Sequence, residues 1–325
     1  MKAIANLDPA TYVRHAIHGE GRTWIETNCY TDVVVELLHG LGHEPLAAMA
    51  FPLAADFEGD QWTFFKFEHA DLMRLYGWDI HELAPWRPLV AHIEEQVGLG
   101  RPVLVELDSF YLPDTAGTAY RLAHVKSTVA VNAIDPAREW MGYFHNQGYH
   151  QLEGQDFRDI FQTEGLVHER MMPPYIEYVK FLRHFRKPSA QEQAALSLEL
   201  LKDQLSRAPE RNPFVPFKAR LEADSEWLLN ADMELFHAYS FATFRQFGAC
   251  YELAATFLQW LGAQGVAGLG EAETAFQEIS TTTKAYQFQL ARAMARKRPF
   301  DVTVIDSLAA AWERGMTDLR GRFLP

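Results

Sequence analysis

The pattern of apolar positions divides the chain into a mixed first part and a helical second part. Up to about residue 170, short apolar runs alternate with amphipathic stretches, and beyond Pro173-Pro174 the apolar residues recur at helical spacing. Helices are predicted in the second part over residues 189–207, 217–229, 233–264, 271–296 and 304–320. The pattern therefore predicts an α+β domain over residues 1–174, followed by an all-helical domain over residues 175–325.

The first part is predicted to combine helices with strands. A helix over residues 28–39 ends at Gly40 and Gly42, and a buried strand follows over residues 102–108. A hairpin is expected from residues 124–134 and 140–146. The other predicted elements are a strand over 62–67 and helices over 69–75 and 86–97.

Composition and charge narrow the class of protein. Hydrophobic residues make up 48% and charged residues 22% of the 325 positions, which is ordinary for a globular protein. The sequence has no run long enough to span a membrane and no apolar core typical of a secretory signal, so a soluble cytoplasmic protein without a membrane partner is expected. The net charge of −13 argues against nucleic-acid binding. Basic residues still cluster at 180–187 and 292–298, either as solvated helix ends or as a docking patch for an acidic partner.

The two cysteines, Cys29 and Cys250, are too few for a disulfide scaffold or a four-cysteine zinc site. Cys29 lies at the predicted start of a helix, where unpaired N–H groups and the helix dipole favour a thiolate. Cys250 lies in the middle of a predicted helix among apolar residues, which is typical of a core position. Cys29 is therefore the candidate nucleophile, although the run Val33–Val35 is also compatible with a strand.

A nucleophilic cysteine needs a base, and the base needs a group that orients it. His124 opens a predicted strand directly after a loop, so it is the candidate base. In the predicted hairpin Asn146 lies beside His124 and can accept its second ring N–H. Asp135 is the reserve, since it lies at the far end of the hairpin and its Asp-Pro context already indicates a turn residue. No metal site is predicted; His39 and His43 have i,i+4 spacing, but glycines interrupt the helix between them.

These elements resemble known families. The order of elements resembles the papain-like cysteine peptidases, in particular the bacterial leader-peptidase branch: Cys29 begins the first helix, and His124 opens a strand that is followed by Asn146 on the next strand. That resemblance implies a papain-like fold, in which the helix that bears the cysteine packs on an antiparallel sheet. A closer resemblance is to the N-terminal domain of the acyltransferase family of butirosin biosynthesis, BtrH, and it rests on residues 28–29, 39–42 (His-Gly-Leu-Gly), 101–113, Tyr120, His124 and Asn146. The bacterial family of domain of unknown function 1839 resembles the chain over its whole length. The sequence departs from the peptidases at Tyr30, where they commonly have glycine, and it has no glutamine a few residues before Cys29.

The resemblance to BtrH implies a thiol acyltransferase. The donor would be a thioester on the phosphopantetheine of an acyl or peptidyl carrier protein, with no cofactor bound by the chain itself, and the acceptor would be a small amine. Cys29 would form the acyl intermediate with His124 as base, and its backbone N–H, with Asn28 or Thr23, would stabilise the oxyanion. Asp108 and Tyr111 are candidate residues for binding the acceptor, or else a turn residue and a core aromatic.

Two other functions remain open from the sequence. With water as acceptor, the same residues would form a cysteine peptidase or amidase. A catalytically inactive binding scaffold of the same fold is the third possibility, and it requires no contact between Cys29 and His124.

Overall fold

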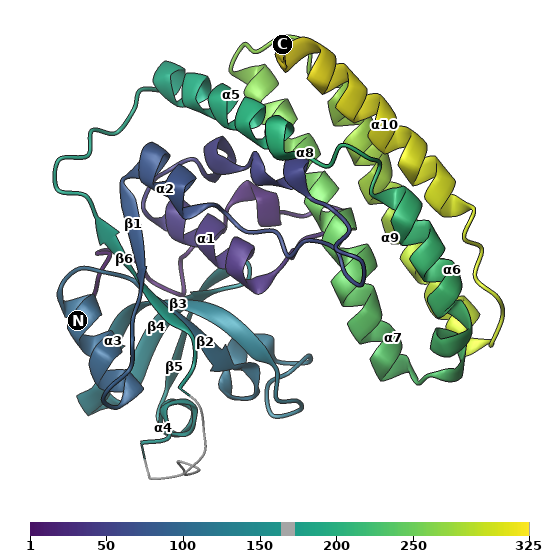
Figure 1. Cartoon of the computed structure of the whole chain (residues 1–325). Helices are drawn as coiled ribbons and strands as arrows, with labels where there is room; N and C mark the ends of the chain where they lie inside the picture. Colours follow the sequence, from purple (N-terminus) through teal and green to yellow (C-terminus); the bar gives the residue numbers. More distant parts are fainter. Residues whose placement is uncertain (164–172, 325) are drawn as a thin grey trace. The chain divides into compact units, whose positions relative to one another are not determined.

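The computed structural model describes residues 1–163 and 173–324, and the chain forms two compact units (Figure 1). The first, here called the sheet unit, consists of Met1–Glu20, Asn28–Pro45 and Leu72–Lys187. The second, the helical unit, consists of Gly21–Thr27, Leu46–Asp71 and Pro188–Pro325. The chain thus contributes two short early stretches to the helical unit before its long helices begin.

The sheet unit is built on one six-stranded sheet with the order β1-β6-β2-β3-β4-β5, in which all neighbouring strands are antiparallel. The strands are β1 (Trp78–Glu82), β2 (Val103–Asp108), β3 (Lys126–Asp135), β4 (Trp140–His145), β5 (Gly148–Glu153) and β6 (Ile176–Phe181). The predicted α+β class with an antiparallel sheet is confirmed. The predicted hairpin is the β3–β4 pair, joined by a turn after Asp135.

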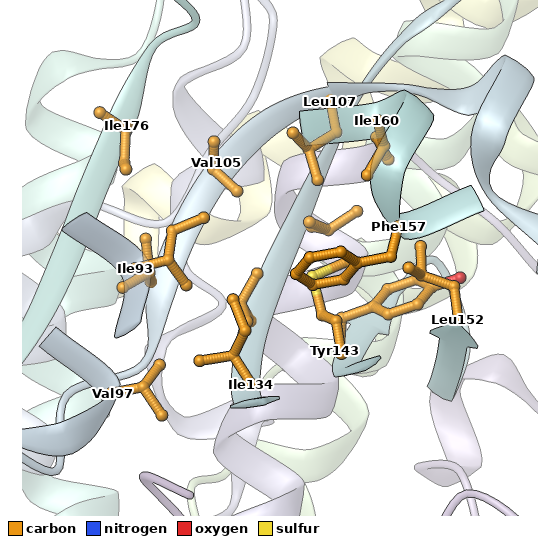
Figure 2. Close-up of a cluster of buried hydrophobic side chains, with 14 of the residues drawn as sticks. Ile93, Val97, Val105, Leu107, Ile134, Tyr143, Leu152, Phe157, Ile160 and Ile176 are labelled. Atoms are coloured by element: carbon orange, nitrogen blue, oxygen red, sulfur yellow. The ribbon is translucent and has the colours of Figure 1, made fainter. Parts of the chain in front are cut away.

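The two faces of the sheet carry different helices. One face and α3 (Leu89–Gly98) and α4 (Gln155–Phe161) enclose an apolar core, part of which is drawn in Figure 2. The opposite face packs against α1 (Cys29–Gly40), which contacts β3, β4 and β5. Gly40 lies so close to the Phe144 ring that a Cβ at this position would be 2.9 Å from it. The alternation of side chains along each strand therefore decides whether a residue faces the apolar core or α1.

The helical unit confirms the predicted helical region. Its long helices are α5 (Ala190–Arg207), α6 (Phe214–Asn230), α8 (Gln246–Ala263), α9 (Gly270–Ala295) and α10 (Val304–Phe323). The predicted single helix over 233–264 is divided into α7 (Met233–Ser240), a π-helical turn (Phe241–Arg245) and α8. Ser189 caps α5 with a capping box. None of the helices in the described ranges combines the length and the apolar character needed to cross a bilayer.

Two further features differ from the sequence prediction. Residues 62–67 form no strand, because Trp62 turns its ring into an aromatic cluster with Phe214 and Phe247 in the helical unit. The sheet unit ends at Lys187, whereas the sequence places the domain boundary near residue 175. The reason is β6, which follows that boundary and pairs with both β1 and β2. The helix α2 (His69–Tyr76) crosses the division between the units, which falls after Asp71.

Candidate functional site

Cys29 is the first residue of α1. Asn28 caps the helix, and its side-chain oxygen accepts a hydrogen bond of 2.9 Å from the Thr31 N–H. The Cys29 side chain is partly exposed, and its Sγ lies 3.6 Å from Oγ1 of Thr128 on β3. Among the described residues the Cys29 N–H has no hydrogen-bond partner. A partly exposed thiol therefore lies at a helix N-terminus, beside one unused backbone donor.

His124 is paired with Asp108 on the neighbouring strand. Nδ1 of His124 lies 2.6 Å from Oδ2 of Asp108, whose other oxygen accepts from the Phe110 N–H at 3.0 Å. The imidazole also stacks on the Phe110 ring, with centroids 4.3 Å apart and planes at 12°. Since Nδ1 donates to the carboxylate, the neutral ring presents Nε2 as a proton acceptor. The His124 side chain is 65% exposed, so this acceptor can be reached by a substrate.

Cys29 and Asp108 lie on the same face of the sheet. Successive side chains of a strand point to opposite faces of the sheet. Asp108 follows Leu107 and Thr128 precedes Val129, and both of these neighbours belong to the apolar core. Asp108 and Thr128 therefore point to the face that carries α1.

Among the interactions of the described residues, no hydrogen bond or ion pair joins Cys29 and His124. Thr128, which touches Cys29, is four positions beyond His124, and about 13 Å separates the two Cα atoms at about 3.3 Å per residue. At the position between them, Nζ of Lys126 lies 2.8 Å from the Glu106 carboxylate. The structure thus brings together His124 with Asp108, and Cys29 with Thr128, as two neighbouring pairs.

Asn146 is not the partner of His124. The ladder between β3 and β4 stops at the pair Ala130–Phe144, and Asn146 follows β4 in the turn to β5 with a φ of 46°. The chain reverses at Asn146 instead of extending alongside residues 124–126, and Asp108 on the other neighbouring strand takes the predicted orienting position. Asp135, the reserve, caps the turn after β3 by accepting from the Arg138 N–H, which confirms its role as a turn residue.

The remaining predicted site residues have other surroundings. Thr23 belongs to the helical unit, and its N–H donates to the Glu252 carboxylate at 2.8 Å, so this predicted oxyanion donor is already engaged. Tyr111 lies edge-on to His124, with ring centroids 6.2 Å apart, and packs against the apolar core. Cys250 is 1% exposed in α8, and burial raises the pKa of its thiol, as expected for a core cysteine.

A second histidine forms a complete chain of hydrogen bonds on the opposite face of the sheet. His145 Nε2 lies 2.6 Å from Ser127 Oγ, and its Nδ1 lies 2.6 Å from Asp114, which also accepts from Tyr143. Burial alone would raise the pKa of Asp114, but the hydrogen bond and charge of His145, the charge of His150 and the Tyr143 hydroxyl hold it below its usual range. The order Asp-His-Ser matches a hydrolase triad, yet His145 is 1% exposed and lies among core residues. We therefore assign a structural role to this series of hydrogen bonds.

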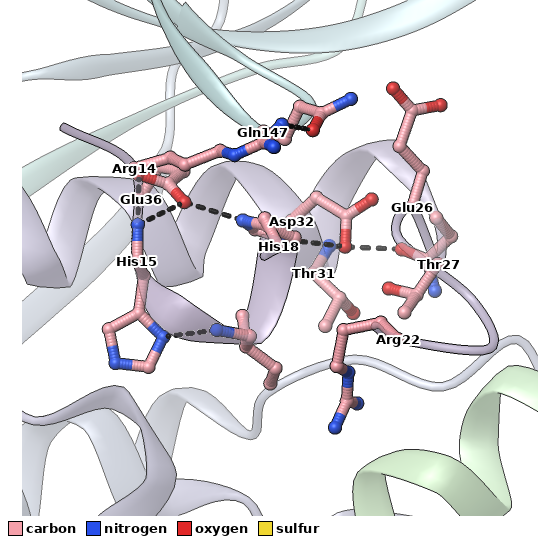
Figure 3. A network of polar contacts seen from close by, with 12 residues as sticks. Arg14, His15, His18, Arg22, Glu26, Thr27, Thr31, Asp32, Glu36 and Gln147 are labelled. Atoms are coloured by element: carbon pink, nitrogen blue, oxygen red, sulfur yellow. Dashed lines mark hydrogen bonds and ion pairs between the residues drawn. The ribbon is translucent and has the colours of Figure 1, made fainter. Parts of the chain in front are cut away.

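A buried ionic network anchors the N-terminal segment to α1 (Figure 3). His18 lies between two carboxylates one turn apart, 2.5 Å from Glu36 and 3.3 Å from Asp32. Burial lowers the pKa of His18, but the hydrogen bonds and charges of both carboxylates outweigh it and raise the pKa to about 9. Glu36 also accepts from the Tyr12 hydroxyl and the His15 N–H. The network fixes the helix that carries Cys29.

Sequence reasoning missed Thr128 as the neighbour of Cys29. It predicted Asp108 as an acceptor-binding or turn residue and not as the partner of His124. Counting two residues at a time from His124 along the predicted strand reaches Lys126 and Thr128, so alternation could have placed Thr128 on the face of the site. The pairing of β2 with β3, which brings Asp108 to His124, follows from long-range register alone.

Two family models match the chain. The DUF1839 N-terminal domain matches residues 13–181, and the DUF1839 C-terminal domain matches residues 190–321. The gap between the matched regions contains the division between the two units at Lys187 and Pro188. No curated protein matches the chain.

Proposed function

The chain belongs to the DUF1839 family, and we propose that it is a thiol acyltransferase with Cys29 as nucleophile. One observation carries the proposal: the partly exposed Cys29 begins α1, with an unused backbone N–H, on the sheet face that also carries the His124–Asp108 pair. A cysteine helix packed on an antiparallel sheet is also the arrangement of the papain-like fold, which we propose for the sheet unit.

The first step is attack of the Cys29 thiolate on the carbonyl of a thioester. A bond forms between Sγ and the acyl carbon, the donor thiolate leaves, and solvent protonates it. The Cys29 N–H is placed to stabilise the tetrahedral oxyanion. The donor is proposed to be carried by the phosphopantetheine of an acyl or peptidyl carrier protein.

The second step uses His124. Because the His124 side chain is exposed and makes no hydrogen bond to Sγ among the described interactions, we assign Nε2 to the acceptor rather than to the thiol. An amine attacks the acyl-Cys29 carbonyl and loses a proton to Nε2, which releases an amide and restores the thiolate. Asp108 holds the ring in the tautomer that this step requires.

This division of roles is tested by mass spectrometry of the intact protein with a thioester donor and an amine. We expect acyl-Cys29 to form in wild type and in His124→Ala, but to accumulate in His124→Ala because transfer is slowed. Cys29→Ala should form no acyl-enzyme, and Cys250 serves as the internal control that stays unmodified. Loss of acylation in His124→Ala would contradict the assignment.

The alternatives give different outcomes. Release of a carboxylic acid in place of the amide indicates the cysteine hydrolase. The separation of Cys29 from His124 favours a binding scaffold, which predicts no acyl-enzyme and alkylation of Cys29 only as an ordinary thiol with a pKa of about 8.5 ionises.

A further inference from the structure

The end of α9 and the loop after it form a pocket within the helical unit. Its volume is about 270 Å³, and it is lined by residues from 286 to 301. Three arginines, Arg292, Arg296 and Arg298, lie on its wall. The apolar part of the wall includes Leu290 and Phe300. The pocket therefore combines concentrated positive charge with an apolar surface.

The three arginines are exposed, and among the described residues none of their guanidinium groups makes an ion pair or a hydrogen bond. Two other basic side chains of the same unit are paired, Lys218 with Asp306 and Arg314 with Glu278. Three exposed guanidinium groups at one pocket are therefore available to bind an anion.

A buried hydroxyl at the same pocket also lacks a partner. Tyr286 lines the pocket, is 1% exposed, and its hydroxyl has no hydrogen-bond partner in the described chain. A buried donor without an acceptor costs roughly 1–3 kcal/mol. The hydroxyl is closed to solvent, so a ligand oxygen accepts this hydrogen bond only if the pocket wall around it moves.

The dipole at the C-terminus of α9 accounts for the positions of only two of the three arginines. Arg292 lies in the last turn of α9 and Arg296 at its C-cap, where the helix dipole favours positive charge. Arg298 lies beyond the helix and shares the pocket without that benefit. The carboxylate of Asp301, which also lines the pocket, is engaged with the Thr303 N–H at 3.1 Å.

We propose that this pocket binds a small phosphate ester. Arginine guanidinium groups match the oxygens of phosphate in paired hydrogen bonds, and the apolar wall would hold the organic part of the ligand. The volume lies below the 300–1,000 Å³ typical of drug-sized ligands, so the site fits a compact monoester. This proposal is independent of the chemistry at Cys29.

Calorimetric titration of the full chain with phenyl phosphate, inorganic phosphate and phenol tests the proposal. We expect phenyl phosphate to bind tightest and phenol not to bind, with affinity falling as salt is added. The double variant Arg296→Gln/Arg298→Gln should bind phenyl phosphate at least about tenfold more weakly, since two charge-assisted contacts are lost. Tyr286→Phe should also weaken binding, while leaving the melting temperature unchanged or higher.

The matched control is Lys218→Gln/Arg314→Gln, which removes two positive charges of the same unit away from the pocket and should keep wild-type affinity. Equal affinity for phenol and phenyl phosphate, or equal losses in both double variants, would overturn the proposal. So would unchanged affinity in both the arginine and the Tyr286 variants. Binding of an acidic carrier protein through these arginines, without binding of phenyl phosphate, would also overturn the proposal and would indicate that the arginines form a protein-docking patch.

Discussion

At the scale of single residues, burial decides which polar groups are available for chemistry. His124 and His145 each form a hydrogen bond of 2.6 Å between Nδ1 and an aspartate, and these bonds alone would suggest the same role for both histidines. The His124 side chain is 65% exposed, whereas that of His145 is 1% exposed. Only the first can exchange a proton with a substrate.

The buried His18 makes stability depend on pH. Its pKa is about 9 in the folded chain and about 6.5 when unfolded. Because the folded value is the higher one, its contribution is complete below pH 6.5 and is lost as the pH rises through 9. We expect His18→Gln to lower the free energy of unfolding of the sheet unit by about 3 kcal/mol at pH 6, since it removes the positive charge that lies between the buried carboxylates of Asp32 and Glu36.

Urea unfolding, with hydrogen exchange in α1 as the readout, measures this effect. The difference between wild type and His18→Gln should shrink toward pH 10. His81→Gln, at an exposed histidine paired with Asp79, is the control and should show only a small effect. A constant difference between pH 6 and pH 10 would show that His18 is not charged in the folded state.

At the scale of elements, adjacent residues of β3 serve opposite faces. Ser127 bonds to His145 on the core side, and Thr128 touches Cys29 on the side of α1. Thr128→Val should slow iodoacetamide labelling of Cys29 near pH 7, because the thiolate loses a hydrogen-bond donor. Ser127→Ala should leave labelling unchanged and lower the free energy of unfolding by about 1–3 kcal/mol, because a buried ring nitrogen loses its partner. Labelling that responds equally to both changes would contradict the assignment of faces.

Two glycines of α8 offer a matched comparison in the helical unit. A Cβ at Gly248 would lie 2.6 Å from the Trp24 ring, whereas one at Gly262 would meet nothing within 4 Å. Gly248→Ala should therefore lower the free energy of unfolding by about 1–3 kcal/mol through overpacking. Gly262→Ala should raise it by about 0.5–1 kcal/mol, since alanine favours the helix. Denaturant titration checks both, and a stabilising Gly248→Ala would contradict the close packing of Trp24.

At the scale of the whole molecule, the helical unit depends on two early stretches of the chain. Trp62 packs among Phe214, Phe217 and Phe247, and the Trp24 indole donates to Ser280. Both tryptophans precede residue 188 and would be absent from a fragment of the C-terminal helices.

A fragment of residues 188–325 is therefore expected to lack a cooperative thermal transition and to bind a hydrophobic dye, because the aromatic cluster is left incomplete. Adding a peptide of residues 46–71 should restore part of the transition. Circular dichroism during heating measures both. Cooperative unfolding of the fragment alone, at the temperature of the full chain, would show that the helices do not need the early stretches.

The sequence by itself determined what depends on local spacing. Helical periodicity, the caps Asn28 and Ser189 and the hairpin turn at Asp135 lie within a few residues of the groups they organise, so the position of Cys29 at a helix start could be predicted. Only the tertiary structure decided what depends on distant pairing. The register of β2 against β3 brought Asp108 to His124, β6 completed the sheet from beyond the predicted boundary, and Trp62 joined the helical unit. These outcomes follow from which distant segments bury one another's surface and hydrogen bonds, and a local pattern does not contain that information.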